Sequence, residues 1–140
     1  MRLMQLIYAS RPSGFEAAML EEILVTARRC NERDGLTGAL ICRRDLFIQM
    51  LEGPRDKVTA TFGRILQDRR HVDVSLVWCG DTSMRIFADW TMRDDPVMCW
   101  MWTRAELRLR DVTALAAVEL RQVFVRLAKQ PQLGWSAAAD

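Results

Sequence analysis

The sequence predicts an α+β fold of the ferredoxin-like kind, a β-α-β-β-α-β sheet with one further strand. Three observations support this prediction. Strand-like and helix-like apolar patterns follow one another in that order, and two short apolar runs form a hairpin between them. An apolar C-terminal segment with helical spacing must also bury one face. We therefore expect two helices on one face of the sheet and C-terminal helices on the other. The 140 residues, 50% of them hydrophobic, suit about one globular domain.

The first strand and the first helix have clear boundaries in the sequence. Leu3–Ser10 is an apolar run that ends at the turn residues Arg11-Pro12-Ser13-Gly14. Apolar residues then recur at helical spacing from Phe15 to about Arg33. Asn31 continues the spacing of four residues that includes Ile23, so we expect it at the C-terminal end of the helix face that packs on the sheet.

A hairpin and a second helix follow. Thr37–Arg43 and Leu46–Gly53 are short apolar runs separated by two residues, the length of a hairpin loop. Pro54 can open a helix, which we expect from Arg55 to Asp68. Arg64 and Asp68 are four residues apart, so they are expected on one face of this helix.

Two further strands, Val72–Gly80 and Met84–Trp90, complete the expected sheet. In this topology we expect the first and third strands side by side and parallel in the centre, beneath the groove between the two helices. Tyr8 and Gln49 would then lie on adjacent strands. Each is a polar side chain in an apolar run and must find hydrogen-bond partners or cost a few kcal/mol. Together they indicate a polar ligand inside the core.

The residues after Trp90 are expected to form a helical extension. Asp111 is a typical N-cap for a helix from Val112 to about Ala128. The apolar face of this helix is expected to pack on the free side of the sheet or on a partner chain. We accordingly expect a first domain at residues 1–94 and the extension at residues 95–140.

Charge and residue usage exclude several classes of protein. A net charge of +2 without a basic stripe argues against a nucleic-acid partner. No apolar run approaches the roughly 18 residues of a membrane span, and no secretory signal is present, so we expect a cytoplasmic protein. The four cysteines lack the spacing of a metal site or a disulfide framework. The single histidine, His71, is expected at the surface or at the start of a strand, and no nucleophile is nominated to act with it.

Five short motifs occur in a fixed order along residues 3–94. They are Tyr8-x-Ser10, Asn31 followed by Gly35-Leu36-Thr37-Gly38-Ala39-Leu40, Phe47-Ile48-Gln49-Met50-Leu51-Glu52-Gly53-Pro54, Asp68-Arg69-Arg70-His71, and Arg85-x-Phe87-x-x-Trp90-Thr91-Met92. In this order and spacing, the chain resembles the BLUF domains, blue-light sensors that use FAD. The resemblance is to the short members of that family, which carry only C-terminal helices beyond the sensor domain.

The resemblance implies that FAD is held non-covalently, with its ring system between the two helices. Tyr8 would donate an electron and a proton to the excited flavin. Gln49 would hydrogen-bond both Tyr8 and the flavin edge, and its amide would rearrange after excitation. Trp90 and Met92 would relay the change outward. Many members have a second polar residue just before the asparagine, where this chain has Cys30. The implied cofactor-binding residues are Asn31, Gln49, Arg64, Asp68, Ser10, Ile23, Ala27, Phe62 and Ile65.

The resulting interpretation is a blue-light photoreceptor that is not an enzyme and holds no metal. A reversible red-shifted state would signal through the last strand and the C-terminal helices to an unidentified downstream protein. A homodimer is compatible with the apolar C-terminal segment. One alternative is a flavin-dependent redox enzyme on the same fold, although the chain has no dinucleotide fingerprint. The other is a flavin-free dimeric ligand-binding domain, which would require Tyr8, Gln49 and Asn31 to be a coincidence.

Overall fold

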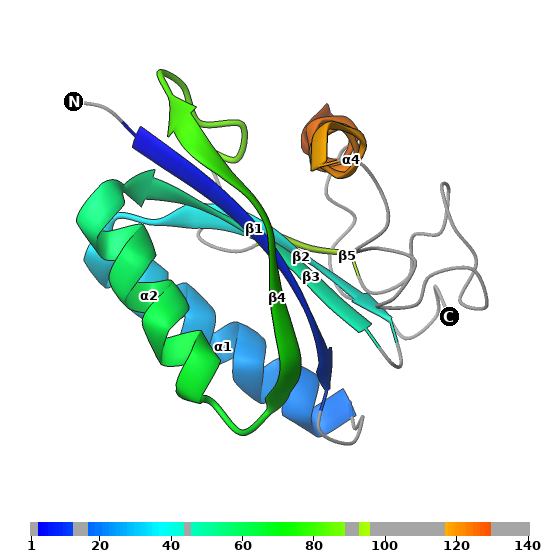
Figure 1. Cartoon of the computed structure of the whole chain (residues 1–140). Helices are drawn as coiled ribbons and strands as arrows, with labels where there is room; N and C mark the ends of the chain where they lie inside the picture. The colour runs from blue at the N-terminus through cyan, green and yellow to red at the C-terminus, as the bar shows by residue number, and fades with distance from the viewer. Residues whose placement is uncertain (1–2, 13–16, 44–45, 89–92, 96–116, 130–140) are drawn as a thin grey trace.

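The computed structural model describes residues 3–12, 17–43, 46–88, 93–95 and 117–129. One five-stranded sheet has the order β4-β1-β3-β2-β5. Its strands are β1 (Leu3–Pro12), β2 (Thr37–Arg43), β3 (Leu46–Pro54), β4 (His71–Thr82) and β5 (Arg93–Asp95). Helices α1 (Ala17–Asp34) and α2 (Arg55–Gln67) cover one face, and α4 (Ala117–Lys129) lies against the other (Figure 1). The predicted ferredoxin-like arrangement is confirmed.

The central strands β1 and β3 are neighbours as predicted, but the predicted parallel direction is wrong because they pair antiparallel. β2 and β3 form an antiparallel hairpin, whereas the crossover through α1 returns β2 in the direction of β1. The strand inserted between β1 and β2 must therefore run the opposite way. β4 pairs antiparallel with β1, and β5 pairs parallel with β2.

The chain after β4 also differs from the prediction. β4 continues to Thr82, and residues 83–88 form bends and a turn rather than the predicted strand Met84–Trp90. The backbone N–H groups of Ile86 and Phe87 donate to the buried Glu52 carboxylate, at 3.0 and 2.6 Å, instead of to a neighbouring strand. The fifth strand, β5, comes later in the chain.

The helix boundaries decide which side chains can share a face. α1 ends at Asp34, where Gly35 adopts the left-handed conformation with φ of 70° that suits a glycine after a helix. α2 ends at Gln67, and Asp68 is extended with ψ of 121°. Asp68 therefore lies beyond the helix in which it was predicted, and the spacing of four residues from Arg64 does not bring the two side chains onto one helix face.

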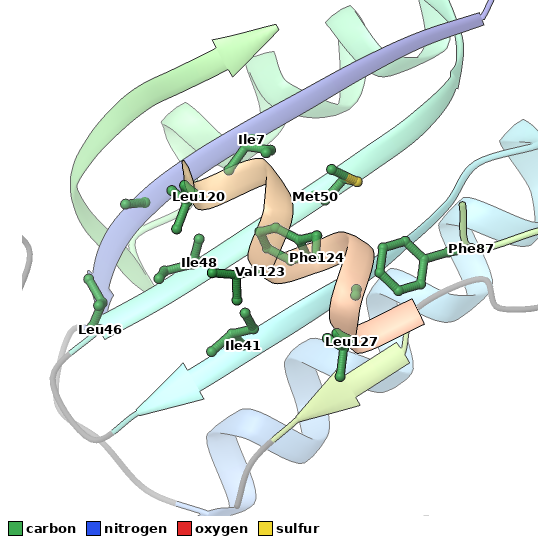
Figure 2. Packing of buried hydrophobic residues seen from close by; sticks show 12 residues of the cluster. Ile7, Ile41, Leu46, Ile48, Met50, Phe87, Leu120, Val123, Phe124 and Leu127 are labelled. Atoms are coloured by element: carbon green, nitrogen blue, oxygen red, sulfur yellow. The ribbon is translucent and has the colours of Figure 1, made fainter. Parts of the chain in front are cut away.

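Two hydrophobic clusters hold the layers together through β3, which is buried from Leu46 to Gly53. On the face of α1 and α2, Tyr8, Phe47 and Leu51 pack with Ile23 and Val58. On the other face, α4 packs on strands β1, β2 and β3 (Figure 2). Its contacts there involve Leu120, Val123, Phe124, Leu127, Ile7, Ile41, Ile48, Met50 and Phe87. This is one of the two locations that the sequence allowed for the C-terminal helix; its expected N-cap, Asp111, lies outside the described residues.

Candidate functional site

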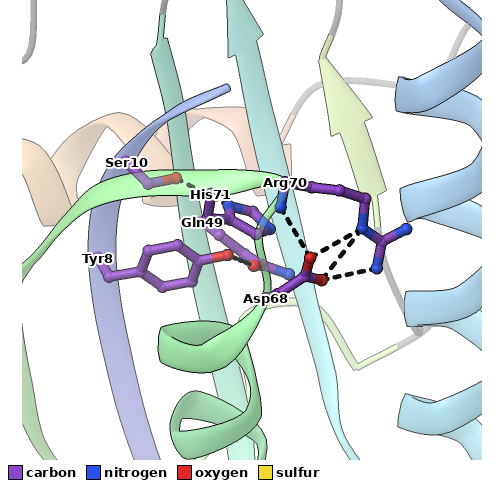
Figure 3. A network of polar contacts seen from close by, with 6 residues as sticks. All are labelled: Tyr8, Ser10, Gln49, Asp68, Arg70 and His71. Carbon is purple, nitrogen blue, oxygen red and sulfur yellow. Dashed lines mark hydrogen bonds and ion pairs between the residues drawn. The ribbon is translucent and has the colours of Figure 1, made fainter. Parts of the chain in front are cut away.

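Tyr8 and Gln49 form a buried hydrogen-bonded pair on the two central strands. The β1–β3 register puts them directly opposite each other, and the exposed fraction is 0% for Tyr8 and 6% for Gln49. The Tyr8 hydroxyl donates a hydrogen bond to Gln49 Oε1 (Figure 3). The predicted juxtaposition of these residues is therefore confirmed, although it comes from an antiparallel pair.

The surroundings keep the phenol of Tyr8 protonated. Burial raises the pKa of Tyr8 far above its ordinary value, and the negative charge of Asp68 raises it further. The Phe62 ring of α2 lies 5.6 Å from the Tyr8 ring, at an interplanar angle of 44°. Tyr8 is thus a neutral hydrogen-bond donor held against an aromatic ring of the neighbouring helix.

His71 belongs to the same site. It is the first residue of β4, with an exposed fraction of 8%, and its Nδ1 is 2.9 Å from Ser10 Oγ. Its ring meets the rings of Tyr8 and Phe47 edge-on, at 6.0 and 5.4 Å. Burial lowers the pKa of His71, so the neutral ring is favoured. The sequence correctly allowed a position at the start of a strand, but it did not indicate that β1–β4 pairing buries the ring.

Asp68 pairs with Arg70 rather than with Arg64. Arg70 donates to the Asp68 carboxylate from its backbone N at 2.9 Å, from Nε at 3.0 Å and from Nη2 at 2.7 Å (Figure 3). These hydrogen bonds lower the pKa of Asp68 and raise that of Arg70. Arg64 instead donates to Thr61 Oγ1 at 2.9 Å and to Asp34 at 3.3 Å. Arg70 occurs within one of the five motifs, but the sequence indicated no role for it.

The remaining candidate side chains surround the same face of the sheet. Asn31 lies near the end of α1 and is 2% exposed, and Ile23, also on α1, is 8% exposed. Ala27 on α1 and Phe62 and Ile65 on α2 are partly buried against the cluster that contains Tyr8. Apolar side chains from both helices therefore border the region around Tyr8 and Gln49. Arg64 lies at its margin, with 53% of its side chain exposed.

Cys30, next to Asn31, is half-buried and has a free thiol. Trp90 and Met92, the predicted relay residues, lie outside the described residues. Within the described part of the chain, no three metal-ligating side chains gather into a group. No helix among the described elements has the length and apolar character to cross a membrane.

This arrangement can support chemistry that moves one proton and reorients one amide. A neutral phenol donates to an amide oxygen, and the same amide carries two N–H donors on its nitrogen. Rotation of the Gln49 amide would exchange donor and acceptor toward its neighbours. The donor set also fits the polar edge of a flavin ring, since amides and a guanidinium complement its carbonyl and N–H groups, while Ala27, Phe62 and Ile65 suit its flat apolar faces.

The chain is similar to known light-responsive proteins. The family model for BLUF, sensors of blue-light using FAD, matches residues 3–93. The chain is 40% identical over 74 residues to the photoactivated adenylate cyclase subunit beta of Euglena gracilis. The matched region is 52% of this chain and 9% of that protein. It is 34% identical over 86 residues to the blue light- and temperature-regulated antirepressor BluF of Escherichia coli, covering 61% of this chain and 21% of that protein.

Solved structures share the fold over nearly the whole chain. BlrB, a BLUF protein in its dark state, has a TM-score of 0.73 and 28% identity, and the match covers 91% of this chain and 96% of BlrB. BlsA in its photo-activated state has a TM-score of 0.77 and 25% identity, with coverage of 96% and 100%. The chain therefore matches these two structures over most of their length, whereas it spans only 9% of the cyclase subunit.

Proposed function

The chain belongs to the BLUF family of blue-light sensors that use FAD, and we propose that Tyr8 and Gln49 carry out its light response. The observation that carries the proposal is the buried hydrogen bond from the Tyr8 phenol to Gln49 Oε1. When bound, FAD would absorb the blue light and take up an electron and a proton. Tyr8 would supply both, and Gln49, which accepts the phenolic hydrogen bond, would pass the proton on.

Burial supports the role of Tyr8 as a coupled donor. Its raised pKa keeps the proton on the phenol in the dark. A phenol that loses an electron becomes strongly acidic, and in a buried site its proton leaves along an existing hydrogen bond more readily than through water. The hydrogen bond to Gln49 provides that route.

The Gln49 amide then serves as the switch. A primary amide has two donors and two acceptor sites on one planar group. Rotation or tautomerisation would change which neighbour receives a hydrogen bond from Gln49. A new Gln49 donor toward bound flavin would give a small red shift of the absorption, which would last until the amide returns to its first arrangement.

The residues proposed to hold the ring come from α1 and α2. Asn31 would bind its polar edge, and Ile23, Ala27, Phe62 and Ile65 would cover its faces. Ser10 would act through its contact with His71. The guanidinium paired with Asp68 is that of Arg70, so we propose Arg70 for the polar role that the family resemblance implied for Arg64.

The signal is proposed to reach a partner protein. One relative is a photoactivated adenylate cyclase subunit and another is a blue light- and temperature-regulated antirepressor, so light sensing is coupled to an effector in those proteins. Several properties of this chain stay predictions. They are a separate partner protein, a homodimer, the relay through Trp90 and Met92, the absence of enzymatic activity and the cytoplasmic location.

The first experiment is an absorption spectrum of the FAD-loaded protein in the dark and immediately after blue illumination. The expected result is a flavin spectrum that shifts slightly to the red and relaxes in the dark. Bound flavin without a reversible shift would contradict the proposal. Addition of NADH in the dark is the companion test, because rapid bleaching of the flavin would indicate redox catalysis instead.

A further inference from the structure

A second buried polar pair lies on the same two strands as Tyr8 and Gln49. The β1–β3 register places Gln5 opposite Glu52, three positions along from the first pair. Because side chains alternate between the two faces of a strand, this pair projects toward the opposite face, the one that α4 covers. Both Gln5 and Glu52 are 0% exposed.

Four donors hold the Glu52 carboxylate. Gln5 Nε2 and the backbone N of Ile86 each lie 3.0 Å from Oε2. Thr37 Oγ1 and the backbone N of Phe87 lie 3.0 and 2.6 Å from Oε1. The carboxylate therefore joins β1, β2 and the chain that follows β4 to its own strand, β3. A buried carboxylate with this many fixed donors has little freedom to shift without stretching one of its hydrogen bonds.

Gln5 extends this network to α4. Its Oε1 accepts hydrogen bonds from Arg121, at 3.3 Å from Nε and 3.2 Å from Nη2. A guanidinium only donates and a carboxylate only accepts, so the two partners define the orientation of the Gln5 amide. Arg121 also lies over the Trp78 ring, 5.4 Å from its centroid. A continuous chain of hydrogen bonds thus runs from β3 to the C-terminal helix.

We propose that Glu52 is a positioning residue that carries the light signal from β3 to α4 through Gln5 and Arg121. The inference rests on the proposed function, and it adds a route through the sheet itself. Gln49 and Glu52 share one strand, so a rearranged Gln49 amide that displaces β3 also displaces the Glu52 carboxylate. The displacement changes two sets of hydrogen bonds to the Glu52 carboxylate. One set comes from the backbone N–H groups of Ile86 and Phe87, and the other comes from Gln5, which also contacts Arg121.

The test is residue-resolved amide hydrogen exchange of the full chain loaded with FAD, in the dark and under blue light. Arg121→Met removes the donors to Gln5 but keeps an apolar stem over Trp78, and Gln5→Leu removes the bridging amide. Lys129→Met is the matched control, since it removes a positive charge from an exposed position of the same helix. The absorption shift is recorded on every sample.

In the unchanged protein we expect light to alter exchange at the N–H groups of Ile86 and Phe87 and in α4. Both Arg121→Met and Gln5→Leu should keep the absorption shift and lose the light–dark difference in α4, whereas Lys129→Met should keep both. The double variant should lose no more of the light–dark exchange difference in α4 than either single variant, because each substitution breaks the same chain of hydrogen bonds.

Three results would overturn the inference. The α4 difference could survive in Arg121→Met and Gln5→Leu, or the Ile86 and Phe87 amides could exchange equally in light and dark. Alternatively, α4 could already lose protection in the dark in either variant, which would show that Arg121 and Gln5 only hold the helix in place. A missing absorption shift in the unchanged protein would instead contradict the proposed function, so the two failures are distinguishable.

Discussion

Tyr8 donates its phenolic hydrogen bond to Gln49 from the directly opposite position of the neighbouring strand. Directly opposite residues have the closest side chains across an antiparallel pair. A one-residue slip of the register would turn one of the two side chains to the other face of the sheet. The buried core on both faces of β3 opposes such a slip, so the packing of the sheet also maintains the geometry of the proposed light response.

Replacement of Tyr8 by Phe should abolish the red-shifted state while FAD remains bound. The ring shape is kept and only the hydroxyl is lost, so the expected change in the free energy of unfolding is about 1 kcal/mol. The measurement is the absorption spectrum before and after blue illumination, with chemical unfolding as the check on folding. A Tyr8→Phe protein that still shows the full reversible shift would disprove the role of the phenol.

Gln49→Leu should also remove the shift, since leucine has a similar size but cannot exchange donors and acceptors. The Tyr8 hydroxyl would lose its partner in a buried site, at an expected cost of about 1–3 kcal/mol in stability. Gln49→Glu is the informative companion, because it keeps an acceptor for Tyr8 and loses the amide donors. If the Gln49→Leu variant photocycles normally, the amide is not the switch.

Asn31→Ala should weaken FAD binding rather than block the photocycle of the molecules that still hold FAD. The loss of one or two hydrogen bonds of about 1 kcal/mol each corresponds to roughly a tenfold rise in the FAD dissociation constant. A titration of the apoprotein with FAD, followed by fluorescence, measures it. Val25→Ala on the exposed side of the same helix is the control, and equal affinities for the two variants would count against Asn31 as a ligand.

Phe124→Ala should lower the free energy of unfolding by about 3–5 kcal/mol. Phe124 is 0% exposed and meets Phe87 edge-on at 6.3 Å, within the cluster that α4 forms with the sheet. Val118→Ala, at a position that is 63% exposed, should change it by no more than about 0.5 kcal/mol. Equilibrium unfolding at several protein concentrations decides the matter. If the free energy of unfolding of Phe124→Ala falls only slightly, or by an amount that depends on protein concentration, α4 packs mainly on a second chain in solution.

Acidification should destabilise the protein through His71. Burial holds its folded-state pKa below the ordinary value of 6.5, with the charge of Asp68 opposing that shift and the charge of Arg70 adding to it. The unfolded chain therefore binds a proton at a pH where the folded chain does not. The contribution of His71 to stability is complete above a pH of about 6.5 and falls as the pH drops below it.

Urea unfolding at pH 7.5 and pH 5.5 measures this contribution, and His71→Gln is the control because glutamine can still contact Ser10 without titrating. Between pH 7.5 and pH 5.5, the free energy of unfolding should fall less in His71→Gln than in the unchanged protein. The Asp68 carboxylate, whose pKa is lowered mainly by Arg70, acts only at more acidic pH, below its ordinary value of 3.8. If the free energy of unfolding falls equally in both proteins, groups other than His71 cause the acid destabilisation.

The sequence by itself determined the order of the elements through β4, the hairpin and the apolar run that forms β3. The topology predicted from that order placed Tyr8 and Gln49 on adjacent strands. The sequence also determined that the C-terminal helix has an apolar face. These features follow from local spacing, because the period of apolar residues reports how each segment is buried, whatever segment it packs against. The family motifs are local for the same reason.

Only the tertiary structure decided which polar groups meet. Asp68 binds Arg70 because α2 ends one residue earlier than the spacing predicted, and His71 is buried because β4 pairs with β1. The predicted strand at Met84 is lost where Ile86 and Phe87 donate to Glu52, 34 and 35 positions away in the chain. Such contacts depend on the register and the end of each element, and the spacing of apolar residues within one segment reports neither of them.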